Sequence, residues 1–217
     1  MTRKTLFLPV LMLLLAGFTL TRDRADEART PQPALTDLAD WQVDHVHSKL
    51  SFKARHFGIS NVRGEFQDYD ASISFEPEDL STLQASVRVR AASVFTGNDR
   101  RDNHLRSDDF FNAEVDSIIT FTSTGVRNID GDSFELVGDL TIRGHTREVV
   151  LDAAFLGTVS MERGGEMTER AAFEAETKVN RFDYGLKFDS TVGGAGDLVV
   201  GEEVTLIIEL ELVKQAA

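Results

Sequence analysis

The chain has 217 residues, no cysteine and a formal net charge of −13. A cysteine-free chain cannot form disulfides, thiolate zinc sites or iron–sulfur clusters. The excess of carboxylates disfavours nucleic acid as a partner, since nucleic-acid binding depends on cations that neutralise phosphates, and it disfavours adsorption of the whole chain to an anionic membrane.

The chain opens with a segment typical of an export signal. Basic residues near the start precede an apolar run over residues 6–20, which is short for a membrane span. The following residues, 21–40, are polar and contain proline, as linkers do. We therefore predict a signal peptide over residues 1–20 and a linker over 21–40. An uncleaved membrane anchor is the alternative for the first segment.

From residue 41 onward, apolar and polar residues alternate, which is the period of a half-buried β-strand. Residues 49–56 are the clearest case: one face is apolar and ends in His56, and the other is cationic. A change of apolar phase near residues 67–70 predicts a bulge or a break. Other strands are predicted around residues 41–43, 62–75, 83–91, 119–121, 134–142, 147–155, 171–179 and 204–212.

One stretch lacks the two-residue period and carries polar residues on all sides. Asn98 or Asp99 can cap a short helix there, ending near Ser107. Phe110 and Phe111 follow as adjacent aromatic residues, which are suited to plugging the end of a core. The segment is therefore predicted to be a helical insert between strands.

About eight antiparallel strands with one short helical insert predict an all-β fold. A closed barrel removes the unpaired sheet edges and can enclose a small ligand, and a β-sandwich is the alternative. One tryptophan and two tyrosines are too few for the aromatic girdles of a membrane barrel. The predicted outer strand faces are charged, as a solvated exterior requires.

Several short motifs occur in order along the chain. They read Trp41-x-x-Asp44-x-x-His47-Ser48-x-x-x-Phe52, His56-x-Gly58, Gly64-x-Phe66, Arg101-Asp102-x-His104-Leu105, Asp109-Phe110-Phe111, Phe121-x-Ser123, Gly138-x-Leu140-Thr141-Ile142-Arg143-Gly144 and Arg181-x-Asp183-Tyr184-Gly185. Together, over residues 41–213, they resemble the YceI-like family, also called polyisoprenoid-binding proteins.

The resemblance implies an extended lipocalin-like barrel in the periplasm with an elongated apolar cavity. It also implies a long isoprenoid or other aliphatic lipid as ligand, such as a polyprenyl phosphate or a quinone. We expect binding, sequestration or transport of that lipid. A packed structural or stress-response barrel without ligand is the alternative. Transient membrane contact and a homodimer stay open as further associations.

The lipid would lie against the apolar strand faces, because each buried CH₂ contributes about 0.8 kcal/mol. Alternatively, these faces only fill a packed core. The inward candidates are Leu50, Phe52, His56, Phe66, Val87, Phe121, Leu140, Phe173 and Leu206. His56 would be a polar contact for a head group or, alternatively, a hydrogen-bonded core histidine. Arg101, Asp102 and His104 are head-group candidates at one barrel end, with a salt-bridged cap as their alternative role.

A metal site or an enzyme has little support in the sequence. His45 and His47 share a strand face, but Asp44 would point away, which leaves two imidazoles without a third ligand. No G-x-S-x-G, H-E-x-x-H or Walker motif is present. We therefore predict no metal, no cofactor and no enzymatic activity. A metal-dependent or hydrolytic enzyme that uses His45, His47, His56 or His104 is the alternative.

Overall fold

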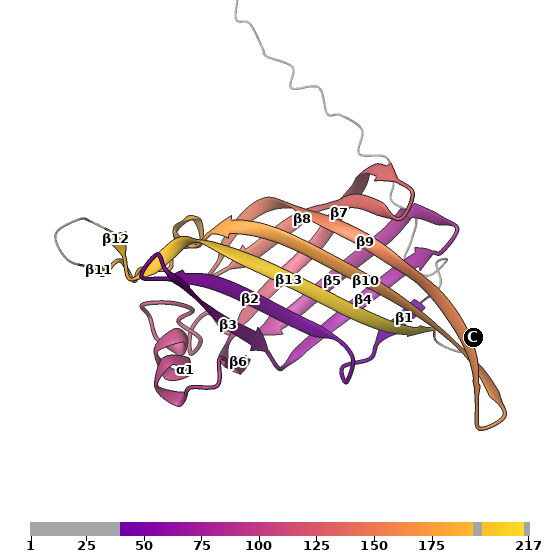
Figure 1. The fold of residues 1–217 in the computed structure, drawn as a ribbon, viewed down its shortest axis with the longest axis horizontal. Helices are drawn as coiled ribbons and strands as arrows, with labels where there is room; N and C mark the ends of the chain where they lie inside the picture. Colours follow the sequence, from indigo (N-terminus) through magenta and orange to yellow (C-terminus); the bar gives the residue numbers. More distant parts are fainter. Residues whose placement is uncertain (1–39, 193–196, 215–217) are drawn as a thin grey trace, which may run out of the picture. The chain divides into compact units, whose positions relative to one another are not determined.

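The computed structural model describes residues 40–192 and 197–214 (Figure 1). The predicted signal peptide and linker lie outside the described residues, apart from Asp40. The strands are β1 (Asp40–Val43), β2 (Lys49–His56), β3 (Ser60–Phe66), β4 (Tyr69–Glu76), β5 (Asp79–Arg90), β6 (Val94–Phe95), β7 (Ile118–Asp130), β8 (Ser133–Ile142), β9 (His145–Arg163), β10 (Glu166–Asn180), β11 (Thr191–Val192), β12 (Asp197–Leu198) and β13 (Val200–Lys214). The helices are α1 (Asp99–Arg106) and the 3₁₀ turns η2 (Ala91–Ser93) and η3 (Arg181–Tyr184). In this part of the chain, no helix is long and apolar enough to cross a membrane.

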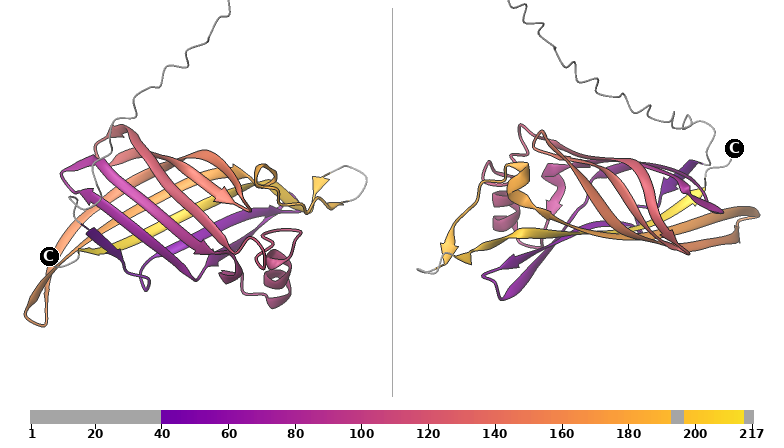
Figure 2. Two further views of the ribbon diagram at one scale, coloured as in Figure 1. Left: turned by 180° about the vertical axis from the view of Figure 1, so that it is seen from behind. Right: turned by 90° about the horizontal axis from the view of Figure 1, so that it is seen from above.

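Eight of the strands close into an antiparallel barrel, which confirms the predicted fold and rejects the sandwich. The ring runs β1-β4-β5-β7-β8-β9-β10-β13, and β1 pairs again with β13 to close it. A second branch, β2-β3-β6, extends from β13. Figure 2 shows the strands crossing the barrel obliquely, as closure of a small barrel requires.

One edge of β13 serves two strands. β2 pairs with residues 200–209 of β13, and β1 pairs with residues 212–214. Between them, the buried Ser48 side chain takes the place of a strand partner: its Oγ accepts from the Glu211 N–H at 2.9 Å and donates to the Glu211 carbonyl at 3.1 Å. The Asp44 N–H donates to the same carbonyl at 2.8 Å. The edge therefore stays hydrogen-bonded where the chain turns away.

The break predicted near residues 67–70 is confirmed, and it divides the predicted strand 62–75 into two strands. β3 ends at Phe66 and β4 begins at Tyr69. The two linking residues bond to the end of β5 and to η2, since the Asp68 carbonyl accepts from the Arg90 N–H and the Gln67 N–H donates to the Ser93 carbonyl. β3 and β4 are separate strands that do not pair with each other, so each has its own apolar phase.

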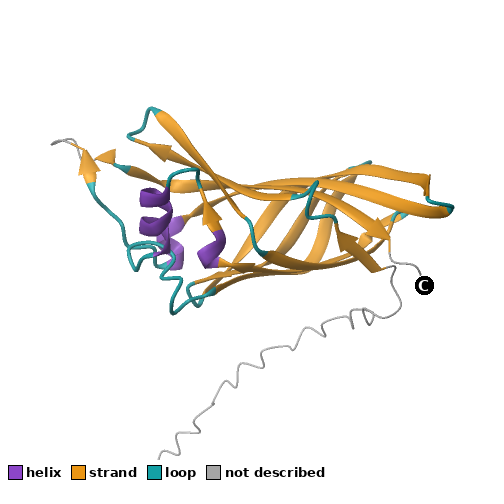
Figure 3. Ribbon diagram, turned by 90° about the horizontal axis from the view of Figure 1, so that it is seen from below, coloured by secondary structure: helices purple, strands orange, loops and turns teal. Residues whose placement is uncertain are grey.

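The helical insert also matches its prediction. Asn98 caps α1, because its side chain accepts from the Arg101 N–H at 3.0 Å, and Ser107 follows the last helical residue. Arg106 connects the helix to η2 and β6 by donating to the carbonyls of Ala92 and Val94. Figure 3 shows α1 at the end of the barrel where the β2–β3 hairpin projects.

Replacing Ser48 by Ala should lower the free energy of unfolding by about 1–3 kcal/mol, because the Glu211 N–H would be left buried without a partner. Urea denaturation measures the effect. Ser86, an exposed residue of β5, provides the control: Ser86→Ala should change stability by less than about 0.5 kcal/mol. Equal effects of the two substitutions would contradict the role given to Ser48.

Candidate ligand-binding cavity

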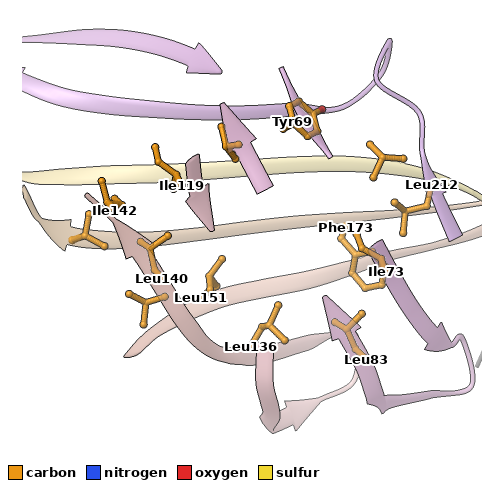
Figure 4. Packing of buried hydrophobic residues seen from close by; sticks show 14 of the residues in the cluster. Tyr69, Ile73, Leu83, Ile119, Leu136, Leu140, Ile142, Leu151, Phe173 and Leu212 are labelled. Atoms are coloured by element: carbon orange, nitrogen blue, oxygen red, sulfur yellow. The ribbon is translucent and has the colours of Figure 1, made fainter. Parts of the chain in front are cut away.

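The inward faces of the strands enclose a cavity of about 230 Å³. Its wall is built mainly of hydrocarbon side chains, and Figure 4 shows several of them converging from different strands. Eight of the nine residues predicted to face inward line it: Leu50, Phe52, Phe66, Val87, Phe121, Leu140, Phe173 and Leu206. The alternation of each strand therefore identified its cavity face correctly, and lipid binding by these side chains stays a prediction.

The helical insert closes one part of the cavity with aromatic rings. Leu105, Phe110 and Phe111 line the cavity from the insert. The Phe111 ring meets the edge of Phe66 at 5.4 Å, and Phe66 in turn packs against Phe52 at 5.8 Å. A ring contact thus runs from the insert to the wall strands β3 and β2.

Two glycines make room for wall phenylalanines. A Cβ on Gly64 would lie 2.4 Å from the Phe52 ring, and a Cβ on Gly138 would lie 2.5 Å from the Phe121 ring. Each glycine therefore lets an aromatic side chain lie flat over the neighbouring strand. This packing fixes where the two rings stand in the cavity wall.

Further lining residues were missed by the sequence reasoning. β4 and β9, which carried no candidate, contribute Ile73, Val149 and Leu151. Strands that carried one also contribute Leu83, Val89, Ile119, Leu136 and Ile142. Most of these stand in the same apolar phase as a residue that was named, so the alternation could have found them. Arg181, Tyr184 and Leu186 lie in or beside η3, where no two-residue period operates. The motif Arg181-x-Asp183-Tyr184-Gly185 includes two of them, but the alternation gave no reason to place them at the cavity.

Arg181 is the one arginine of the described chain that lines the cavity, and it is only 3% exposed. Its Nε and Nη2 donate to the carbonyls of Gly201 and Val200, each at 3.0 Å, and the guanidinium lies 4.0 Å from the centre of the Phe182 ring. Burial lowers the pKa of Arg181, although Glu202 and Asp189 act in the opposite direction. Nη1 has no hydrogen-bond partner among the described residues.

Two tyrosines also line the cavity and remain neutral phenols. Burial raises the pKa of Tyr184 to about 12, and burial followed by the charge of Glu65 raises the pKa of Tyr69. The Tyr69 hydroxyl, like Arg181 Nη1, is buried without a partner in the described chain. The cavity is thus apolar, with unsatisfied hydrogen-bonding groups buried beside it at two residues.

His56 and the three head-group candidates do not line the cavity. His56 ends β2, and its ring contacts the Phe57 ring at a tilt, with the ring centroids 3.9 Å apart. Arg101 donates from Nε and Nη2 to the hydroxyl and carbonyl of Thr96, and the buried Asp102 accepts from the Thr96 N–H and hydroxyl. His104 pairs with Asp109 at 2.8 Å. These contacts hold the insert together, and contact with a head group stays a prediction.

A second polar cluster lies at the β1–β2 turn. Ligand atoms of Asp44, His47 and Glu211 lie within 4.8 Å of one another. The Arg170 guanidinium bonds to both carboxylates, at 2.8 Å for Asp44, and so already supplies positive charge there. Its hydrogen bond, followed by that of His47, holds the pKa of Asp44 well below its usual range. His45 packs instead on the Tyr69 ring at 4.8 Å.

The family model for the YceI-like domain matches residues 41–212, which contain all or most of each of the eight strands of the ring. The chain belongs to the YceI-like family. It is 37% identical to Protein YceI of Escherichia coli O6:H1 over 179 residues, which cover 82% of this chain and 88% of that protein. The resemblance inferred from the motifs is therefore confirmed.

Solved structures of other proteins have a similar fold. The Campylobacter jejuni YceI protein is 33% identical, with a TM-score of 0.64 and coverage of 75% of this chain and 90% of that one. A polyisoprenoid binding domain from Saccharophagus degradans, implicated in plant cell wall breakdown, has a TM-score of 0.58 at 18% identity. It covers 82% of this chain and 99% of that one, and its likeness shows the fold alone.

In this YceI-like barrel, Gly138→Ala should lower the free energy of unfolding by about 1–3 kcal/mol, because the new Cβ would overlap the Phe121 ring and the Thr122 carbonyl. Chemical denaturation measures the loss. Gly125→Ala is the matched control on β7, since no atom lies within 4 Å of its added Cβ. A stability loss for Gly125→Ala as large as that for Gly138→Ala would show that close packing is not the cause.

The Asp44 cluster predicts a pH-dependent stability. The folded-state pKa of Asp44 lies below its unfolded value, so its stabilising effect is complete above about pH 4 and is lost as the pH falls through the folded value. The difference in unfolding free energy between the wild type and Asp44→Asn should be largest at neutral pH and shrink in acid. Urea titrations across this range measure it. Glu203→Gln, which alters the exposed pair with Lys178, should show a smaller difference at every pH.

Proposed function

We propose that this YceI-like protein binds one long aliphatic chain of isoprenoid type in its barrel cavity and acts as a periplasmic carrier or store for it, without catalysis. The single observation that carries the proposal is the closed barrel's cavity, whose wall is almost entirely hydrocarbon. A barrel that served only as a packed structure would gain stability by filling that space with larger side chains.

The chemistry of the wall favours a chain with few polar atoms. Each CH₂ removed from water contributes about 0.8 kcal/mol, so a five-carbon isoprene unit contributes up to about 4 kcal/mol. A buried ester or amide along the chain would need hydrogen-bond partners that the wall scarcely offers. An unsubstituted or methyl-branched hydrocarbon therefore fits the wall better than a peptide or a sugar.

The size of the cavity favours a single chain. Its volume of about 230 Å³ exceeds the roughly 150 Å³ that holds benzene in an engineered protein cavity and lies below the roughly 300–1,000 Å³ of drug-sized pockets. A slender single-chain lipid is compatible with that width along part of its length. A two-chain phospholipid would require the wall strands to separate.

A polar end on the ligand would have suitable partners beside the cavity. Arg181 Nη1 can only donate, and the Tyr69 hydroxyl can donate as a neutral phenol. A ligand end that carries oxygen acceptors, such as a quinone carbonyl or a phosphate, complements these groups. Arg101 and His104 would contact a head group only if it extended past the insert, which keeps their role a separate part of the proposal.

Two further lines support a periplasmic lipid carrier. The N-terminal sequence is typical of an export signal, which would deliver the barrel to the periplasm. The fold is also shared with a domain that is described as polyisoprenoid-binding. Neither line identifies the lipid, so the proposal extends to the class of long aliphatic chains.

Native mass spectrometry of the full chain expressed in a Gram-negative host, followed by organic extraction, tests the proposal. We expect one copy of a single-chain lipid per protein. A protein that carries no lipid and also fails to take up isoprenoid quinones and polyprenyl phosphates from detergent would overturn it.

A pair of neighbouring variants tests the location. Ala153 lines the cavity from β9, whereas Ala154, the next residue, does not. Ala153→Phe should fill part of the cavity and reduce the lipid-loaded fraction at least about tenfold, since several buried CH₂ groups would be displaced. Ala154→Phe should load normally. Equal loading of both variants, each confirmed as folded by circular dichroism, would place the lipid outside the barrel.

A further inference from the structure

The hairpin formed by β2 and β3 has an outer end unlike the rest of this acidic chain. We propose that this end, residues 53–63, which we call the β2–β3 arm, is a docking surface for an anionic lipid bilayer. In Figure 2 (right) and Figure 3 the arm projects at the barrel end that carries α1. The inference goes beyond the proposed function, because docking does not require that the cavity hold a lipid.

The tip of the arm presents apolar side chains to solvent. Phe57 is 45% exposed and Ile59 is 83% exposed. Phe57 also has a positive φ of 52°, a conformation that costs a bulky residue free energy and that Gly or Asn would adopt more easily. The tip is held firmly, since the Phe57 N–H donates to the Val199 carbonyl at 2.9 Å and the Ile59 N–H to the His56 carbonyl at 3.1 Å.

Behind the tip, the outer face of the arm is basic. The arm contains Lys53, Arg55 and Arg63, and no acidic residue occurs in residues 53–63. Lys53 stands directly opposite Arg63 across the two strands, an arrangement of like charges that destabilises a sheet. None of the three forms an ion pair with a carboxylate of the described chain, whereas Lys49, nearer the barrel, lies 3.9 Å from Glu65.

Apolar residues at the tip and cations behind it are arranged like the acyl region and the phosphate layer of an anionic membrane surface. The acyl boundary accepts Phe57 and Ile59, and the phosphates above it attract Lys53, Arg55 and Arg63. The net charge of −13 would repel the whole protein from such a surface. Glu202 and Glu203 of β13 lie in the irregular stretch opposite Arg55, and Glu203 is paired with Lys178. Repulsion from carboxylates farther along the barrel is weakened, because charge effects fall off over about 8–10 Å at physiological salt.

A second hairpin shows that exposed apolar residues alone do not define the surface. The β9–β10 hairpin exposes Val159 (53%) and Met167 (69%), but the residues beside its Gly-Gly turn, Glu162, Arg163 and Glu166, carry a net negative charge. An anionic bilayer would repel this hairpin. It therefore supplies an internal control with a similar number of apolar groups and the opposite charge.

The arm is also continuous with the cavity wall. Phe52 and Ala54 of β2 line the cavity, and the tip begins three residues after Ala54. A bilayer bound at the tip would therefore lie at the end of the barrel closed by the insert. This orientation would direct the same end of the cavity toward the source of a membrane lipid.

Cosedimentation of the full chain with vesicles tests the proposal. Vesicles of equal parts phosphatidylglycerol and phosphatidylcholine should bind the wild type, and pure phosphatidylcholine vesicles or high salt should bind much less. Replacing Lys53, Arg55 and Arg63 together by Gln should weaken binding on the order of a hundredfold. Phe57→Ser with Ile59→Ser should weaken it at least about tenfold. Val159→Ser with Met167→Ser should leave it unchanged.

Separate outcomes would overturn docking without affecting the cavity proposal. Failure of the wild type to bind anionic vesicles would do so, as would equal losses for the β2–β3 and β9–β10 variants. A dimer in analytical ultracentrifugation that depends on Phe57 and Ile59, without vesicle binding, would assign the arm to a second copy of the chain. Loading of lipid from detergent is measured in the same variants and should be unchanged, so a failure of cavity binding is recognised independently.

Discussion

The pairing of one edge of β13 with two different strands is the constraint on which the rest of the structure depends. A sheet edge must be hydrogen-bonded along its length or it exposes backbone groups. β1 satisfies this edge near the C-terminal end of β13, and β2 satisfies it over most of the remainder. Ser48 and Asp44 bridge the step between them. The edge of β13 is therefore paired along most of its length, although β1 and β2 are separated by a turn.

The same division makes the two ends of the barrel different. At one end β13 pairs with β1, which continues the ring to β4, whereas at the other end it pairs with the branch β2-β3-β6. β6 has only two residues and would leave an edge open. Arg106 of α1 covers that edge by bonding to Val94, and Phe110 and Phe111 fill the space inside. The insert is thus required by the strand pairing, and it also completes the cavity.

The alternation along the strands predicted the cavity-facing residues, but it could not predict features that depend on contacts distant in sequence. Period-two reasoning found the cavity faces and the break after Phe66, because each depends on neighbours in sequence. It placed His56 in the cavity because His56 is in phase with Phe52, but the pairing of β2 with β13 is irregular between Ala54 and His56. Arg170 contacts Asp44 across 126 positions, and Arg181 lies in a 3₁₀ turn. No local pattern encodes such contacts.

The net charge of −13 is a sum without positions, so it does not show how the charges are distributed over the barrel. The carboxylates gather in cross-strand rows, where Glu135 faces Asp152, Asp152 faces Glu176, and Glu174 faces Glu209. Like charges in direct opposition destabilise a sheet, so these rows oppose folding, as the basic row on the β2–β3 arm does. Because the acidic rows and the basic arm lie on different strands, the charge distribution of the barrel is asymmetric. Near an anionic surface, the acidic strands β8–β10 would be repelled while the arm is attracted, so the charges that cost stability would also orient the barrel.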